Sequence, residues 1–312
     1  MRNEPSRQNA FPPQEIDTWR RRIGPVGVWL GGAARKDMGA LPEVAAAIDA
    51  LGFGALWIGG GTPDQRALDD LTRLLEAGSD LVVASGIANI WAWTPEALHA
   101  AASEIDAAHP GRFILGLGVS HPTLVSALGH EYRRPVSTMK EFLDGLDQAA
   151  AGSGRRRPFT VLAALRSRML HLARERSGGA HPYFVPVAHT AVARKVLGPT
   201  ALLATEQAVV VDADPDRART VARQHVSRYL QLPNYVHNLA EYGFGDEDFT
   251  NGGSDRLVDS IVAWGSVDRI AARIREHLTL GADHVAIQPL DAQGGLGLEQ
   301  LRDLAPVLVA AP

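Results

Sequence analysis

The feature that most constrains the fold of this chain is a repeated alternation of short apolar runs with segments of helical periodicity. The run VGVWL at residues 26–30 is strand-like, and Leu41, Val44 and Ile48 then recur on one face of a helix before ALWI begins at residue 55. This pattern is typical of successive βα units, in which parallel strands alternate with helices.

The pattern supplies enough strands for a closed barrel. Strand-like runs occur at residues 26–30, 55–58, 81–87, 113–119, 159–165, 180–184, 202–211 and 284–290. No GxGxxG turn follows the first run, so an α/β fold with a TIM (β/α)8 barrel fits better than an open doubly wound sheet. We predict one barrel domain over residues 23–312, with insertions around 120–154 and 231–265 that exceed simple connections. Residues 1–22 are interpreted as a polar N-terminal extension.

Composition excludes several classes of protein. The 312 residues carry 31 basic and 35 acidic side chains, a net charge of -4 that gives no general attraction to nucleic acid. The absence of cysteine excludes disulfides and thiolate chemistry. No signal peptide or membrane span is recognisable, so we expect a cytoplasmic protein with a small-molecule substrate. The arginine runs at 20–22 and 155–157 are interpreted as solvated surface.

In a barrel of this kind ligands bind at the carboxyl ends of the strands. The second strand ends in three glycines, at 59–61, and Trp29 lies near the end of the first strand. Glycine is favoured where something must approach the backbone closely, although a tight turn explains it equally. The histidines at 171, 181 and 189 show no metal-binding spacing, so we expect no catalytic metal.

Five stretches in order give the chain a resemblance to a known family. They are ALWI, VVASGIANIWAWTPEAL, HPGRFILGLGVSH, LAALRSRMLHLARERSGGAHPYFVP and GADHVAIQ, and the overlap as a whole covers nearly everything from Ile23 to Leu290. Together they resemble the luciferase-like monooxygenase superfamily, and especially its branch of coenzyme F420-dependent oxidoreductases. The resemblance implies a barrel of the bacterial luciferase-like type that holds the deazaflavin F420, or alternatively FMN, at its strand ends, and a homodimer.

The resemblance also implies positions that contact the cofactor ring. A cis peptide often lies at the end of the third strand, and the matching step is Gly86–Ile87, where Ile87 would press on the ring. Asn89 could reach polar ring atoms or could cap a loop. Gly118 could admit the ring or accommodate a bulky neighbour. Trp29, Gly59 and Gly60 lie at neighbouring strand ends and complete the expected ring site.

A second set of positions matches the site of the cofactor's phosphate-bearing tail. Backbone amides are expected to come from Ala163, Ala164, Leu165, Gly179 and Ala180. Arg166 stands where relatives commonly have glycine, and could contact the phosphate or crowd the groove. His181 could donate to a phosphate oxygen or bond a neighbouring carbonyl instead.

Relatives usually carry an acid or histidine just after the second strand, where this chain has only glycine. Either the glycines leave room for a ring or bulky substrate, which we favour, or the site has lost its catalytic group. His121 is then the best candidate for a proton donor, with Ser120 assisting through a hydrogen bond.

The sequence leaves three candidate functions to be tested. The first is an F420-dependent oxidoreductase that transfers hydride between the deazaflavin and a small organic substrate. The second is an FMN-dependent luciferase-like monooxygenase, and the third a non-catalytic ligand-binding barrel that has lost its acid. Binding of F420, of FMN or of neither distinguishes them.

Overall fold

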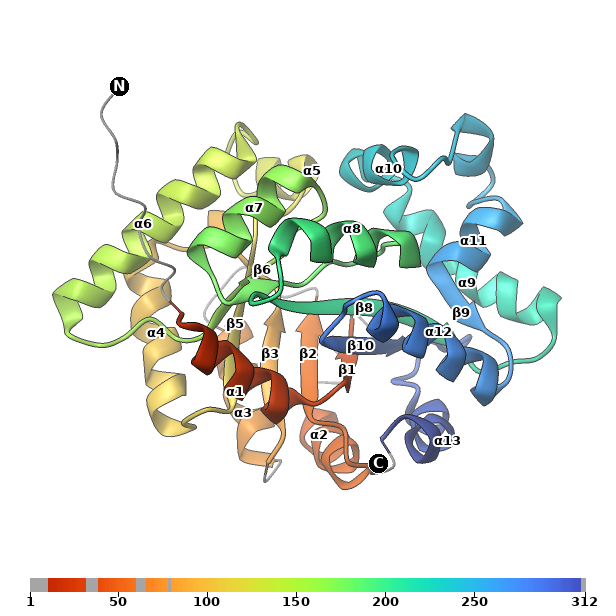
Figure 1. The fold of residues 1–312 in the computed structure, drawn as a ribbon, viewed down its shortest axis with the longest axis horizontal. Coiled ribbons are helices and arrows are strands. Elements are labelled where there is room, and N and C mark those ends of the chain that lie inside the picture. Colours follow the sequence, from red (N-terminus) through yellow and green to blue (C-terminus); the bar gives the residue numbers. More distant parts are fainter. Residues whose placement is uncertain (1–10, 32–38, 60–65, 78–79, 310–312) are drawn as a thin grey trace.

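Eight parallel strands close into a barrel in the structure, a computed structural model that describes residues 11–31, 39–59, 66–77 and 80–309. The barrel strands are β1 (Val26–Leu30), β2 (Ala55–Gly59), β3 (Val82–Gly86), β5 (Phe113–Gly118), β6 (Thr160–Leu162), β7 (Gly179–Ala180), β8 (Leu202–Val210) and β10 (His284–Pro289). Strand β10 pairs with both β1 and β8, which closes the ring. The predicted (β/α)8 barrel is confirmed, and Figure 1 shows its helices packed around the strands.

Two short strands were not predicted. Strand β4 (Ala88–Asn89) follows β3 and pairs with β5, and β9 (Val262–Trp264) extends the sheet from the end of β8. The strands expected at 159–165 and 180–184 are much shorter in the structure. Pro182 and Pro186 cannot donate to a sheet, and Phe184 has a φ of 57°, so the chain leaves β7 at once.

Helices follow most strands, and side-chain caps begin several of them. The layer consists of α2 (Leu41–Ala50), α3 (Arg66–Ala77), α4 (Pro95–Ala108), α6 (Pro135–Ser153), α7 (Ser167–Arg176), α8 (Val187–Leu197), α9 (Pro215–Tyr229), α12 (Val267–Thr279) and α13 (Leu298–Leu308). Thr94 and Ser266 cap α4 and α12 by accepting hydrogen bonds from Ala97 N and Arg269 N. Helix α13 was not predicted. No helix in the described ranges is both long and apolar enough to cross a membrane.

An additional helix covers the amino-terminal end of the barrel. Helix α1 (Pro13–Ile23) packs its buried Trp19 on Phe159, with 4.9 Å between ring centroids, and Phe11 meets the same ring edge-on at 5.1 Å. In Figure 1 this helix lies across the front of the strands. The extension expected over residues 1–22 therefore contains, from Pro13 onward, a helix that belongs to the barrel's core.

The predicted insertions place further elements near the carboxyl ends of the strands. The first contains α5 (Pro122–Ala127) and α6, and the second contains α10 (Pro233–Ala240), a short 3-10 helix η2 (Asp246–Phe249) and α11 (Asp255–Ile261). A 3-10 helix η1 (Ile90–Ala92) also follows β4. Helices α5 and α10 both lie at the upper edge of Figure 1.

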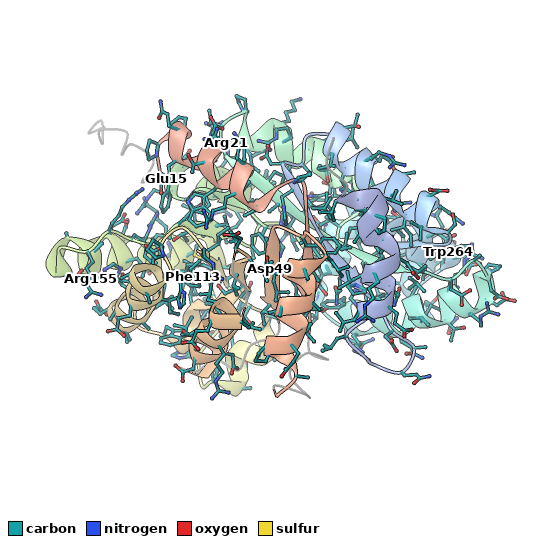
Figure 2. All side chains as sticks on the ribbon, turned by 90° about the horizontal axis from the view of Figure 1, so that it is seen from below. Glu15, Arg21, Asp49, Phe113, Arg155 and Trp264 are labelled. Carbon is teal, nitrogen blue, oxygen red and sulfur yellow. The ribbon has the colours of Figure 1, made fainter. Side chains whose placement is uncertain are left out.

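Side chains alternate between the barrel interior and the layer beneath the helices. Phe113 of β5 is fully buried in the outer layer, whereas Arg21 and Arg155 lie at the periphery (Figure 2). Trp57 faces inward, where its indole N–H donates to His284 Nε2 at 3.1 Å. The interior is therefore filled below the mouth, and any ligand site lies at the carboxyl ends of the strands.

Candidate active site

The glycine that ends β2 makes room for a side chain of the protein itself. A Cβ built on Gly59 would lie 1.9 Å from Cζ2 of Trp29, and one on Gly86 would lie 2.8 Å from Trp29 Nε1. The indole therefore covers the bare backbone of two neighbouring strands. Our expectation that Gly59 leaves room for a ligand is wrong in this structure. Gly60 and Gly61 lie outside the described residues.

Trp29 belongs to an aromatic cluster that covers one side of the mouth. We call Tyr183, Phe184, Tyr229 and Tyr235 the mouth cluster. Trp29 lies 4.7 Å from Tyr183 between ring centroids, and within the cluster Phe184 stacks on Tyr229 at 4.9 Å. These side chains come from the segment after β7 and from helices α9 and α10, so the second insertion contributes Tyr235 to this side of the site.

A hydrogen-bonded chain links the mouth cluster to a cavity. The hydroxyl groups of Tyr183 and Tyr229 lie 2.7 Å apart, and the Tyr183 hydroxyl lies 2.9 Å from Gln288 Oε1. A hydroxyl has one proton, so Tyr183 donates to Gln288 when it accepts from Tyr229. Trp29, Tyr229, Gln288 and the loop after β10 line a cavity of about 290 Å³.

The opposite side of the mouth is more open. The Gly86–Ile87 peptide is cis, as the sequence analysis predicted. Residues 86–89, between the end of β3 and β4, are half-buried, unlike the buried residues that precede them. Ile87 packs over Gly118, where a Cβ would lie 2.5 Å from Ile87 Cδ1. Gly118 thus accommodates a neighbouring side chain, one of the two roles considered for it.

Asn89 has a local role in the structure. Its Oδ1 accepts a hydrogen bond from Trp91 N at 3.2 Å and caps helix η1. The indole N–H of Trp91 donates to Val119 O at 2.9 Å, which ties this helix to the end of β5. The capping role considered for Asn89 is therefore observed, and a contact with a ring stays a prediction.

The positions expected around a phosphate tail lie at the ends of β6 and β7. Gly179 and Ala180 are buried within β7, and Ala164 is buried beyond β6, whereas Ala163 and Leu165 are half-buried. Arg166 is exposed immediately before helix α7 and carries no side-chain cap for it. The first amides of α7 and the Arg166 guanidinium can both attract an anion.

His181 lies deeper in the barrel than a phosphate ligand would. Its ring stacks on Trp57 at 4.3 Å, and its Nδ1–H donates to Ala204 O at 2.8 Å. Burial lowers the pKa of His181 to about 4, so the ring is neutral at pH 7. Nε2 is a buried acceptor without a partner among the described residues. The carbonyl-bonded role considered for His181 is the one observed.

His121 and Ser120 follow β5 at the open side of the mouth. The His121 Nδ1–H donates to Asn234 Oδ1 of α10 at 2.9 Å, and the ring lies 5.4 Å from that of Tyr235. Burial lowers the pKa of His121, although the bond to Asn234 opposes this effect. The neutral ring therefore presents Nε2 as an acceptor. Ser120 has a φ of 57°, a left-handed conformation that sets the direction of the chain at His121.

Sequence reasoning missed one acidic residue of the mouth. Glu206 faces inward from the middle of β8 with only 2% of its surface exposed, and its Oε2 accepts a hydrogen bond from Phe184 N at 3.0 Å. Burial raises its pKa to about 8, although the bond from Phe184 opposes this effect. A single acid within the apolar run LLATEQAVVV was the available signal, because charged residues rarely sit unpaired in buried strands.

The open side of the mouth combines half-buried apolar side chains with one exposed cation. Ile87, Ala163 and Leu165 offer half-buried apolar surface at the ends of neighbouring elements, next to Arg166 at the start of α7. Trp29 Nε1 is also buried without a partner among the described residues. The β3–β6 side is therefore the candidate site for a planar ligand, whereas Trp29 fills the β1–β2 side.

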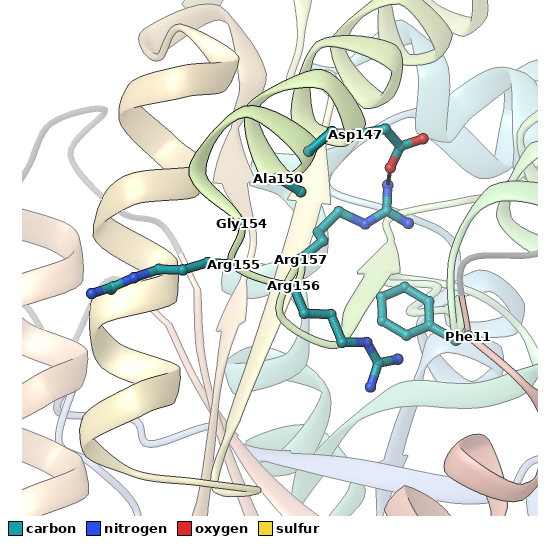
Figure 3. Close-up of a pocket in the computed structure, with 8 residues that line it drawn as sticks. Phe11, Asp147, Ala150, Gly154, Arg155, Arg156 and Arg157 are labelled. Atoms are coloured by element: carbon teal, nitrogen blue, oxygen red, sulfur yellow. Dashed lines mark hydrogen bonds and ion pairs between the residues drawn. The ribbon is translucent and has the colours of Figure 1, made fainter.

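A second cavity, of about 450 Å³, lies by the carboxyl end of α6 (Figure 3). The run 155–157 that lines it is not wholly solvated, which corrects our interpretation. Arg157 is 5% exposed and pairs with Asp147 at 2.9 Å. Burial lowers the pKa of Arg157 to about 10, which leaves it charged at neutral pH. Arg20 likewise pairs with Asp283, at 3.1 Å. These arginines hold the fold together.

The described residues contain no group of three or more His, Asp or Glu side chains placed to hold a metal ion.

The fold and the site define a (β/α)8 barrel with an apolar and aromatic mouth. The chain matches the luciferase-like monooxygenase family over residues 24–284 and belongs to that family of oxidoreductases. No curated protein matches the chain in sequence.

Solved structures share the fold at low sequence identity. An F420-dependent secondary alcohol dehydrogenase in complex with an F420–acetone adduct is similar with a TM-score of 0.70 and 13% identity, over 91% of this chain and 98% of that one. The F420-dependent tetrahydromethanopterin reductase from Methanopyrus kandleri gives 0.67 and 15%, over 91% and 97%. The oxygenating constituent of 3,6-diketocamphane monooxygenase from Pseudomonas putida, with FMN, gives 0.67 and 13%, over 91% and 98%.

Proposed function

We propose that this protein is an F420-dependent oxidoreductase that transfers hydride between the deazaflavin and a small organic substrate. The proposal rests chiefly on the half-buried apolar side chains of Ile87, Ala163 and Leu165 at the ends of neighbouring strands, with His121 just after β5 and Arg166 just before α7. Such a surface suits a flat ring with a substrate at one edge and an anionic tail at the other.

Bound F420 would supply the hydride donor or acceptor, and the protein would bind and orient the substrate beside it. His121 is proposed as an acceptor rather than the donor suggested by the sequence, because its Nδ1–H is engaged by Asn234 and its pKa is lowered. Its Nε2 can accept a hydrogen bond from a substrate hydroxyl. Such positioning lowers the barrier by orienting the reacting carbon.

FMN with oxygen activation is the competing function. The structural neighbours include proteins described with F420 and one described with FMN, all at identities that establish only the fold. Two tricyclic rings of nearly equal shape fit the same surface, so a binding measurement has to decide between them. The homodimer and the cytoplasmic location stay predictions from the resemblance.

The binding surface can be tested by blocking it. Replacing the half-buried Ala163 with Phe places a ring on the proposed surface, and Ala188→Phe makes the same change at an exposed position of α8. We expect wild type and Ala188→Phe to quench F420 fluorescence saturably, and Ala163→Phe to bind at least ~10-fold more weakly. Equal binding by all three proteins would refute the site, and absence of F420 binding by wild type would refute the function.

A further inference from the structure

The cavity of about 290 Å³ beside Trp29 is bounded on one side by helix α9. The residues of this helix that line it follow a helical spacing and are Val221, Gln224, His225, Arg228 and Tyr229. Residues three and four apart share one face of a helix. A helix face turned toward a barrel is normally apolar, whereas this one carries four polar side chains. These side chains therefore border a cavity, which the loop after β10 also lines.

His225 lines this cavity without a hydrogen-bond partner. Only 7% of its surface is exposed, and neither ring nitrogen bonds to a residue in the described ranges. Burial, and then the charge of Arg228, lower the pKa of His225 to about 3, so the ring is neutral at pH 7. A buried polar group without a partner has lost its hydrogen bonds to water, which destabilises the fold. The unpaired imidazole therefore indicates a ligand that restores these bonds.

Two further donors reach the same cavity. Arg228 forms no ion pair with an acid in the described parts of the chain. The Oε1 of the buried Gln288 lies 2.9 Å from the Tyr183 hydroxyl, which leaves the amide protons on Nε2 without a partner among the described residues. A Cβ on Gly31 would lie 3.2 Å from Gln288 Nε2, so a side chain there would cover the amide. Donors from α9 and β10 thus border one space.

The charges in the lining indicate the kind of ligand. Asp291 is the acid among the described lining residues, and its Oδ1 accepts a hydrogen bond from Gln293 N at 2.6 Å. Arg228 and Asp291 are not paired with each other, and their formal charges cancel. The cavity therefore has donors for one oxyanion, without the excess positive charge that a dianion such as phosphate requires.

Most of the remaining wall is apolar. The apolar side chains that line the cavity include Trp29, Leu30, Val221, Pro289, Leu290 and Leu296. The volume of the cavity corresponds to roughly ten non-hydrogen atoms, at the ~30 Å³ that one water molecule occupies in the liquid. Apolar walls with a few polar groups are typical of sites for small molecules.

We propose that this cavity binds a monocarboxylic acid of roughly ten non-hydrogen atoms with an apolar body. The carboxylate accepts hydrogen bonds from Arg228, from Gln288 Nε2 and from the protonated nitrogen of the neutral His225 ring. The body packs against Trp29 and the neighbouring leucines. The inference goes beyond the proposed function, because it holds whether F420 or FMN binds on the β3–β6 side.

The first test uses the protein alone, so its outcome does not depend on F420. The probe is para-fluorobenzoate, a carboxylate of the required size, in a titration followed by fluorine NMR. We expect saturable binding to wild type. The amide para-fluorobenzamide has the same shape but no charge, and should bind at least ~10-fold more weakly because it forms no ion pair with Arg228. Lack of saturable binding of the benzoate, or equal binding of the amide, would overturn the proposal.

Variants locate the bound probe. Arg228→Gln should bind the benzoate at least ~10-fold more weakly, whereas Arg275→Gln, at an exposed position of α12, should bind it as wild type does. Ala163→Phe blocks the proposed ring surface and should also leave probe binding unchanged, since Ala163 is not a lining residue of the cavity. Wild-type affinity in Arg228→Gln overturns the proposal. Loss of the probe in Ala163→Phe does so too, because it would place the benzoate on the ring surface.

His225→Phe separates a ligand contact from a role in the fold. A Phe ring can keep the contacts with Tyr229 and Phe184, whose ring centroids lie 4.9 and 5.9 Å from that of His225. The variant buries no unpaired nitrogen, so its urea midpoint should rise while its affinity for the benzoate falls ~10-fold. A lower midpoint would show that the nitrogens serve the fold, and unchanged affinity would show that they contact no ligand. Either result overturns the proposal.

Discussion

Replacing Gly59 with Ala should destabilise the protein, because the added methyl group would clash with the Trp29 indole. The added Cβ would lie 1.9 Å from Cζ2 and 2.3 Å from Cη2 of the indole, far inside van der Waals contact. Overpacking of this kind costs about 1–3 kcal/mol, whereas Gly→Ala on a compatible backbone gains about 0.5 kcal/mol through the unfolded state. We expect a net loss of about 2 kcal/mol of unfolding free energy.

The double-mutant cycle with Trp29→Leu isolates the cause. Trp29→Leu by itself should cost about 2–3 kcal/mol, since a large buried side chain is shortened. In that background Gly59→Ala should be neutral or slightly stabilising, which gives a coupling energy of about 2 kcal/mol. Urea titrations followed by circular dichroism measure all four proteins. An equal penalty for Gly59→Ala with and without the indole would refute the explanation of this glycine.

Three further predictions concern the residues around the site and the core. His121→Ala should lower kcat with F420 by ~10-fold or more. Asn234→Ala should give a smaller loss, because it frees the His121 ring without removing it. Unchanged turnover in steady-state assays would exclude the proposed roles of His121 and Asn234. Ser120→Gly should raise the free energy of unfolding by about 1 kcal/mol, since glycine adopts a φ of 57° without strain; a lower urea midpoint would contradict this. Asp147→Ala should cost about 3 kcal/mol in thermal or urea unfolding, because the buried Arg157 loses its carboxylate partner and Arg176 loses one of its two; a loss below about 1 kcal/mol would show that the pair is solvated.

The barrel could be predicted because its strands are buried on both faces. Runs such as FILGLGV are almost continuously apolar, and the periodicity of the helices between them is regular. Helix α1 was missed because its arginines hid a helical spacing of apolar residues, Ile16, Trp19 and Ile23. The short strands β6 and β7 could not be delimited, because apolar sequence continues into the mouth where no partner strand follows.

The site was predictable only as far as local sequence determines it. The position of His121 follows from the strand before it, whereas the cis step at Gly86–Ile87 was expected from the resemblance to the family. The filling of Gly59 by Trp29 could not be predicted, because it depends on how two strands place one side chain across the mouth. The partner Asn234 likewise comes from a helix more than a hundred residues away in the chain.

The most direct test of the account is the preference of the purified protein between the two cofactors. Equilibrium titrations of the same preparation with F420 and with FMN, followed by the fluorescence of each cofactor, give two dissociation constants. The account predicts saturable binding of F420 at a lower concentration than FMN. Tighter binding of FMN, or binding of neither cofactor, would contradict it.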